Sequence, residues 1–272
     1  MIDRKKIALL ICERLLMEQE MLRVNYINTR DSIGFFYIDN LLPVAIATAI
    51  AESFPTSSEM KLKKSLKEDK YISAQMDKHS EILEEVLYAF QDPQVVNLIA
   101  EICELQDIYP DEKLYAGGLS LMEKNQFLSP HLDNSHDKER QRWRVLNLLY
   151  YVTPEWKIEY GGNLEVWPNG LKAPQVTIES KFNRLAVMAT HNDSLHSVSK
   201  VLVDKNRCCV SNYYFSDEPL KSSDTFHVTS FRGWPQEKIK DLVLRTDNFL
   251  RQTLRKFFKK GIVENPHYYK KE

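Results

Sequence analysis

Residues 145–152 read VLNLLYYV, a run of β-branched, aliphatic and aromatic side chains broken only by Asn147. A short apolar run of this composition favours a buried β-strand. Six more such runs lie between residues 113 and 215, some separated by turn residues such as Gly161-Gly162. They cover 114–122, 163–167, 175–178, 184–189, 198–203 and 208–215. Closely spaced strands without intervening helices predict antiparallel sheets packed as a sandwich or barrel.

The sequence on either side of this β-rich segment favours helices instead. Apolar residues recur at helical spacing in four N-terminal segments and one C-terminal segment: 3–24, 43–51, 81–90, 93–105 and 235–261. One short strand is expected at Phe35–Ile38. We therefore predict an α+β fold with a mainly β core, organised as a single domain. Its parts are a mostly helical support region at 1–108, the β core at 109–217 and a C-terminal helical extension at 218–272.

Two basic segments allow more than one interpretation. Residues 61–70 contain five lysines and predict a solvated loop or helix face, with a mobile lid as the alternative. The helix expected at 235–261 is amphipathic and basic, and Gly261 would form its C-cap. Such a helix can bind membranes or acidic partners, but we expect it to pack on the β core and to expose its charges.

Composition and charge limit the possible partners of the protein. Among its 272 residues, 37 Lys and Arg balance 38 Asp and Glu, so no global positive field favours nucleic acid. The apolar stretch Ile7–Cys12 is shorter than the roughly 7 to 15 residues of a signal-peptide core, and no membrane segment is expected. The four cysteines show no paired spacing. We expect a cytoplasmic protein with reduced thiols.

A candidate metal site begins at His131 and Asp133, which lie two residues apart. Side chains at i and i+2 of an extended strand point to the same face, so both could reach one ion. His196 lies at the end of a later strand candidate. Two imidazoles and a carboxylate leave three open positions, as in non-haem Fe(II) oxygenases. His191 is an alternative third ligand, and His136 is expected in a loop near the mouth of the site.

Arg207, eleven residues after His196, suggests what the open positions would bind. Two positions can take the 2-oxo acid group of 2-oxoglutarate and one can take dioxygen. The far carboxylate of 2-oxoglutarate then needs a cation about one molecule's length from the metal. The planar fork of Arg207 suits that ion pair, assisted by a hydroxyl group such as that of Ser211 or Tyr151.

Several motifs together resemble one family. They are His131-Leu132-Asp133-Asn134, Leu149-Tyr150-Tyr151-Val152-Thr153-Pro154-Glu155-Trp156, Tyr160-Gly161-Gly162-Asn163-Leu164, Asn183-Arg184-Leu185, His196-Ser197-Val198 and Arg207-Cys208-Cys209-Val210-Ser211-Asn212-Tyr213-Tyr214-Phe215. In order and spacing they resemble the prolyl 4-hydroxylase-like 2-oxoglutarate/Fe(II) dioxygenases. The oxygen-sensing prolyl hydroxylases and their bacterial relatives are the most similar group. The resemblance covers about residues 113–217.

This resemblance implies a double-stranded β-helix core, of the jelly-roll or cupin-like type, with supporting N-terminal helices and a C-terminal helix. It also implies roles for nine residues: His131, Asp133 and His196 as iron ligands, Arg207 and Tyr151 at the distal carboxylate of 2-oxoglutarate, Asn147 and Ser211 as polar pocket residues, and Arg144 and Tyr213 toward the substrate.

The implied activity is hydroxylation of an unactivated C–H bond, with Fe(II), 2-oxoglutarate and O₂, and with ascorbate as a further reductant. The expected substrate is a prolyl residue of a peptide or protein, or a proline-like amino acid. A small metabolite of a biosynthetic pathway is the alternative, and a catalytically silent, metal-containing ligand-binding module is the alternative of another class. The terminal helices could also form a homodimer.

Overall fold

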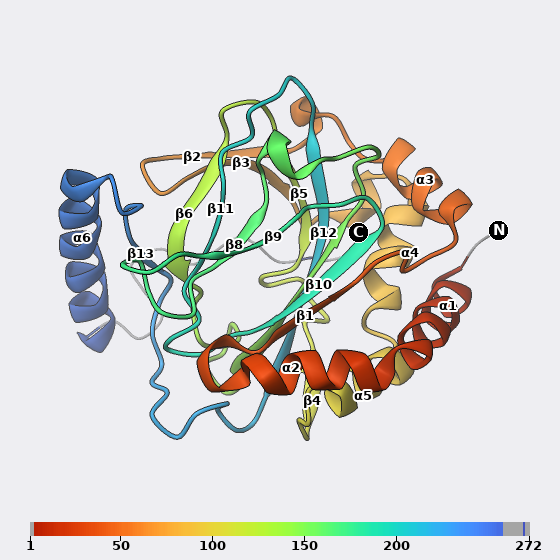
Figure 1. The fold of residues 1–272 in the computed structure, drawn as a ribbon, viewed down its shortest axis with the longest axis horizontal. Helices are drawn as coiled ribbons and strands as arrows, with labels where there is room; N and C mark the ends of the chain where they lie inside the picture. The colour runs from red at the N-terminus through yellow and green to blue at the C-terminus, as the bar shows by residue number, and fades with distance from the viewer. Residues whose placement is uncertain (1–2, 258–268, 270–272) are drawn as a thin grey trace.

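The computed structural model describes residues 3–257 and Tyr269 (Figure 1). The expected C-cap at Gly261 lies outside these residues. The α-helices of the described chain are α1 (Arg4–Met17), α2 (Gln19–Ile33), α3 (Val44–Glu52), α4 (Glu81–Ala89), α5 (Pro93–Ile102) and α6 (Lys238–Phe257). Short 3₁₀ turns occupy Ser57–Glu59, Met76–Lys78 and Ile158–Tyr160.

The strands form one antiparallel sheet. They are β1 (Phe35–Ile38), β2 (Lys61–Lys64), β3 (Glu68–Ser73), β4 (Ile108–Pro110), β5 (Gly118–Met122), β6 (Phe127–Leu132), β7 (Trp143–Tyr151), β8 (Leu164–Val166), β9 (Val176–Ile178), β10 (Arg184–Ala189), β11 (His196–Val198), β12 (Arg207–Ser216) and β13 (Ser230–Phe231). The strand order is β1-β10-β7-β12-β5-β3-β6-β11-β8-β9, with β2 beside β3, β4 beside β12 and β13 beside β6.

The sheet curls around a cavity of about 420 Å³. Residues from β6, β8 and β11 line this cavity together with residues from β5, β7 and β12, so strands on opposite sides of β3 in the strand order border the same cavity. The antiparallel β core predicted from the sequence is therefore confirmed.

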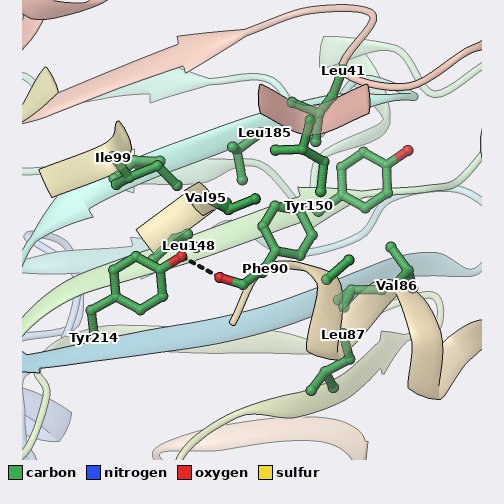
Figure 2. Packing of buried hydrophobic residues seen from close by; sticks show 14 of the residues in the cluster. Leu41, Val86, Leu87, Phe90, Val95, Ile99, Leu148, Tyr150, Leu185 and Tyr214 are labelled. Carbon is green, nitrogen blue, oxygen red and sulfur yellow. Dashed lines mark hydrogen bonds between the residues drawn. The ribbon is translucent and has the colours of Figure 1, made fainter. Parts of the chain in front are cut away.

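Helices α1 to α5 supply one side of the main hydrophobic core, and the sheet supplies the other (Figure 1). The ring of Tyr150 in β7 lies beside that of Phe90, which follows α4, with centroids 5.9 Å apart (Figure 2). The hydroxyl of Tyr214 donates to the carbonyl of Phe90, which satisfies two buried polar groups. Burial of this shared face explains why the N-terminal helices accompany the strands.

Asn183 ties the loop after β1 to the sheet. Its Nδ2 donates to the carbonyl of Leu42 at 2.7 Å, while its Oδ1 accepts from the Leu42 amide at 3.0 Å and from the Tyr150 hydroxyl at 2.8 Å. Asn183 has φ 60°, a left-handed conformation that asparagine tolerates better than most residues. The Asn183-Arg184-Leu185 motif thus has a structural role at this position.

Most predicted elements are confirmed to within a few residues, and two predictions differ more from the structure. The single helix expected at 3–24 is two helices, α1 and α2, which meet at Glu18. The strand expected at 198–203 is wrong, because β11 ends at Val198. The amides of Ser199, Val201 and Leu202 donate instead to carbonyls of three different segments, at Asn163, Gln126 and Tyr160.

The lysine-rich segment 61–70 is not a helix face or an irregular loop. It forms the β2–β3 hairpin, and β3 pairs with both β5 and β6. The alternating pattern was hidden because lysines occupy both faces of the hairpin.

Helix α6 differs most from the expectation. Most of its large apolar side chains face the solvent, and within the described part of α6 only Leu244 and Asn248 are buried. The polar side is fixed to the body of the protein, since Asp241 pairs with Arg232 and Asp247 with Lys67. The expected packing of the apolar face on the β core is therefore wrong. Within the described residues, the structure has no helix that is long and apolar enough to span a membrane.

Candidate metal and 2-oxoglutarate site

Three potential metal ligands that line the cavity converge. His131 is in β6, Asp133 directly follows that strand, and His196 begins β11. Antiparallel pairing of β6 with β11 sets His131 opposite His196, with ring centroids 4.2 Å apart. One ligand atom from each of the three side chains lies within 4.8 Å of the others, so a single ion could be held.

Backbone carbonyls orient both imidazoles. Nδ1 of His131 lies 2.9 Å from the carbonyl of Ser129, and Nδ1 of His196 lies 2.9 Å from that of Ser194. A carbonyl only accepts, so each Nδ1 carries the hydrogen and each Nε2 keeps its lone pair. The two Nε2 atoms lie 3.5 and 3.7 Å from the carboxylate oxygens of Asp133. The donor set therefore fits a divalent cation.

The charge states also suit metal binding. Burial favours the neutral acid, but the polar contact with the neighbouring His131 and the charge of Arg144 hold the pKa of Asp133 well below its usual range. Burial, together with the neighbouring His131, lowers the pKa of His196 to about 4. Asn147 donates to Asp133 Oδ2 at 2.6 Å and fixes the carboxylate.

Arg207 lines the same cavity, and neighbouring groups fix the position of its guanidinium. Its Nε donates to the carbonyl of Gly162 at 3.1 Å and to Ser180 Oγ at 3.3 Å, and its guanidinium lies 4.8 Å from the Tyr151 ring centroid. Gly162 has φ 64°, and an added Cβ would lie 3.2 Å from Arg207 Cγ, so glycine permits this close approach. The terminal N–H groups of Arg207 can therefore meet a carboxylate.

The other predicted pocket residues differ in position. Ser211 and Asn147 line the cavity, whereas Tyr151 does not and instead lies against Arg207 with its hydroxyl buried. Arg144 and Tyr213 also line it, with the Arg144 guanidinium 4.5 Å from the Tyr213 ring centroid. Arg144 Nη1 is 3.5 Å from Asp133 Oδ2. Arg144, and Tyr213 in contact with it, therefore lie beside the candidate metal position.

The structure distinguishes among the rival histidines. His191 is buried outside this cavity, and its Nδ1 accepts from the amide of Asp193. His136 lines the cavity, where its Nδ1 lies 2.6 Å from the carbonyl of Asp137. The part of the chain that the structure describes thus brings only His196, of the two candidates at 191 and 196, to the His131 and Asp133 pair.

Several cavity residues were missed by sequence reasoning. The β2–β3 hairpin contributes Lys63, Glu68 and Lys70, and Lys70 Nζ lies 3.2 Å from Glu68 Oε2. Phe231 of β13 and Arg251 of α6 reach the cavity from the C-terminal extension. The cluster of lysines at 61–70 was a visible signal, but nothing in the local sequence placed it at the cavity.

Comparison with known proteins identifies the β core. Residues 117–215 match the family model described as the 2OG-Fe(II) oxygenase superfamily. This part of the chain is therefore similar to the 2OG-Fe(II) oxygenases. The superfamily implies Fe(II) and 2-oxoglutarate, and the match together with the His131, Asp133 and His196 donor set indicates a 2OG-Fe(II) oxygenase enzyme.

Solved structures share the fold of this chain at low sequence identity. A prolyl hydroxylase from Trichoplax adhaerens, solved with a peptide fragment of the hypoxia inducible factor oxygen degradation domain, is 19% identical with a TM-score of 0.57, and the match covers 77% of this chain and 96% of that one. A Pseudomonas putida prolyl-4-hydroxylase is 17% identical with a TM-score of 0.54, covering 72% and 99%.

A third structure has a different activity. The non-heme alpha ketoglutarate dependent epimerase SnoN from nogalamycin biosynthesis is 16% identical with a TM-score of 0.50, covering 76% of this chain and 88% of that one. A search of curated proteins found no match. The shared architecture confirms the predicted double-stranded β-helix, while the substrate differs among proteins of this fold.

Proposed function

We propose that the oxygenase is a hydroxylase in which His131, Asp133 and His196 hold Fe(II). The observation that carries this proposal is the convergence of two oriented Nε2 atoms and one ionised carboxylate in a cavity that Arg207 also lines. When bound, Fe(II) supplies the site at which O₂ oxidises 2-oxoglutarate to succinate and CO₂ while a substrate C–H bond is hydroxylated.

The chain's own residues prepare this chemistry. Arg207 would anchor the distal carboxylate of 2-oxoglutarate, and the Tyr151 ring, whose centroid lies 4.8 Å from the guanidinium, would support Arg207. Ser211 and Asn147 supply polar groups along the cavity. Arg144 and Tyr213 lie on the side of Asp133 and would face the substrate.

For the substrate, we propose a prolyl residue of a peptide or protein, or a proline-like amino acid. The motif resemblance and the fold shared with two prolyl hydroxylases support this choice. A small metabolite is the second candidate, supported by the fold shared with SnoN. We further propose that the whole chain is one catalytic domain, with regions 1–108, 109–217 and 218–272 as predicted, since helices and strands share one hydrophobic cluster.

Anaerobic spectroscopy followed by mass spectrometry tests the activity. Addition of Fe(II) and 2-oxoglutarate should produce a weak visible charge-transfer band, because the 2-oxo acid chelates an open iron site. Exposure to O₂, with ascorbate as reductant, should then yield a product heavier by about 16 Da, one oxygen atom, from proline, pipecolate or proline-containing peptides. Absence of the band would favour the silent ligand-binding module. A band with oxidation only of other small molecules would favour the metabolite candidate.

The exposed face of α6 supports the proposed homodimer through a terminal helix. Six apolar side chains on this face are 45–83% exposed and recur at helical spacing: Ile239, Leu242, Val243, Phe249, Leu250 and Leu254. In a symmetric dimer the same face of both copies would pack together and bury these side chains. We expect wild-type protein to elute as a dimer in size-exclusion chromatography with light scattering, and Leu242→Glu/Phe249→Glu to elute as a monomer. A wild-type monomer at every concentration would contradict the proposal.

A further inference from the structure

The inner face of α6 reaches the candidate metal site through one buried amide. Asn248 Oδ1 accepts from the amide of Phe231 at 3.0 Å, and its Nδ2 donates to the carbonyl of the same residue at 2.6 Å. These two bonds satisfy both backbone groups of Phe231 from one side chain. Arg251 Nη2 donates to Asn248 Oδ1 at 2.8 Å, which limits rotation of the side-chain amide.

Phe231 in turn contacts a predicted iron ligand. Strand β13 pairs with β6, with Phe231 opposite His131. The two rings are stacked with centroids 5.2 Å apart and an interplanar angle of 21°. The amide of Arg232, the residue after Phe231, donates to the carbonyl of Pro130, the residue before His131, at 2.7 Å. This bond joins the two strands directly beside the stacked rings.

A metal ligand needs its lone pair held within about 10–20° of the productive direction. The bond from Nδ1 of His131 to the carbonyl of Ser129 fixes the tautomer and one edge of the ring, but the ring can still tilt about that bond. A stacked aromatic ring restricts this tilt, because any departure from the parallel arrangement loses ring contact. The position of the Phe231 ring therefore bears on the direction of His131 Nε2.

We infer that Asn248 is a positioning residue for His131, acting through Phe231. This inference rests on the proposed role of His131 as an iron ligand. It assigns the C-terminal extension a task at the metal site, although α6 itself supplies no ligand. A purely structural role of Asn248 would only secure α6 to the protein.

Metal affinity separates these two roles. Mn(II) binding to the full chain, measured by isothermal titration calorimetry without co-substrate, should weaken about 10-fold in Asn248→Ala, the lower end of the range for loss of support behind a metal ligand. Phe231→Leu, which keeps the backbone bonds but removes the ring, should weaken binding similarly. If Asn248→Ala does not fold, the Phe231→Leu variant alone tests the inference.

The matched control is Gln252→Ala, one turn further along α6. Gln252 Nε2 donates to Ser230 Oγ at 3.1 Å, so this change also removes a bond between α6 and β13 but does not touch Phe231. Its Mn(II) affinity should equal that of the wild type. A lower melting temperature with unchanged Mn(II) affinity in Asn248→Ala and Phe231→Leu would overturn the inference. Absence of Mn(II) binding in the wild type would instead refute the metal site.

Discussion

Replacing Asp133 by alanine is expected to abolish succinate formation. The change removes the carboxylate of the proposed ligand set, so the loss should exceed the roughly 10–100-fold cost of removing a residue that merely supports a metal ligand. It also leaves the buried guanidinium of Arg144 without its neighbouring anion. The measurement is succinate release at saturating 2-oxoglutarate, together with Mn(II) affinity by calorimetry.

His191→Gln is the control for this prediction. His191 is the rival ligand in the sequence, and its side chain is buried to the same degree as that of His196. Because it lies outside the cavity, the variant should keep wild-type metal affinity and succinate release. Melting temperatures of both variants separate loss of ligand from loss of fold. Turnover in a folded Asp133→Ala protein, or its loss in a folded His191→Gln protein, would refute the ligand assignment.

The strands and site residues that the sequence predicted correctly are those that a pattern of neighbouring residues identifies. Strand β10 has the bounds expected from its apolar run, because both of its faces are buried and no alternation was needed to find it. The pair His131 and Asp133 was recognisable because two residues of separation suffice to bring the side chains together. His196 and Arg207 were singled out as candidates on later strands, but nothing local relates them to that pair, and the family motifs strengthened their assignment.

The features that sequence missed depend on contacts between distant segments. Helical periodicity located α6 but did not decide which side faces the protein. That choice is made by polar contacts such as Lys67 with Asp247, at 2.6 Å between residues far apart in the chain. The same contact holds the β2–β3 hairpin against α6 at the cavity. A charge pattern alone indicated solvent exposure there, because charged residues that pair across the fold cannot be told from solvated ones.

Replacing Arg207 by alanine should weaken 2-oxoglutarate binding about 100-fold. The effect on the affinity should be larger than the effect on the melting temperature. Hydrogen bonds to a charged partner contribute about 1.5–3 kcal/mol, and each 1.4 kcal/mol corresponds to about tenfold in affinity. The distal carboxylate is remote from the reacting carbon, so its binding is the same before and during reaction. The KM for 2-oxoglutarate should therefore rise, while kcat at saturation changes little.

Two further variants make the Arg207 prediction specific. Arg207→Lys keeps the charge without the planar fork and should recover part of the affinity. Lys70→Gln removes another cation that lines this cavity, from strand β3 of the β2–β3 hairpin, but Lys70 already pairs with Glu68, so the change should cost much less. Affinity is measured anaerobically from the visible charge-transfer band with Fe(II). The cation that contacts the distal carboxylate must dominate its binding. A larger loss of 2-oxoglutarate affinity in Lys70→Gln than in Arg207→Ala would therefore show that Lys70 of the hairpin, and not Arg207, binds the distal carboxylate.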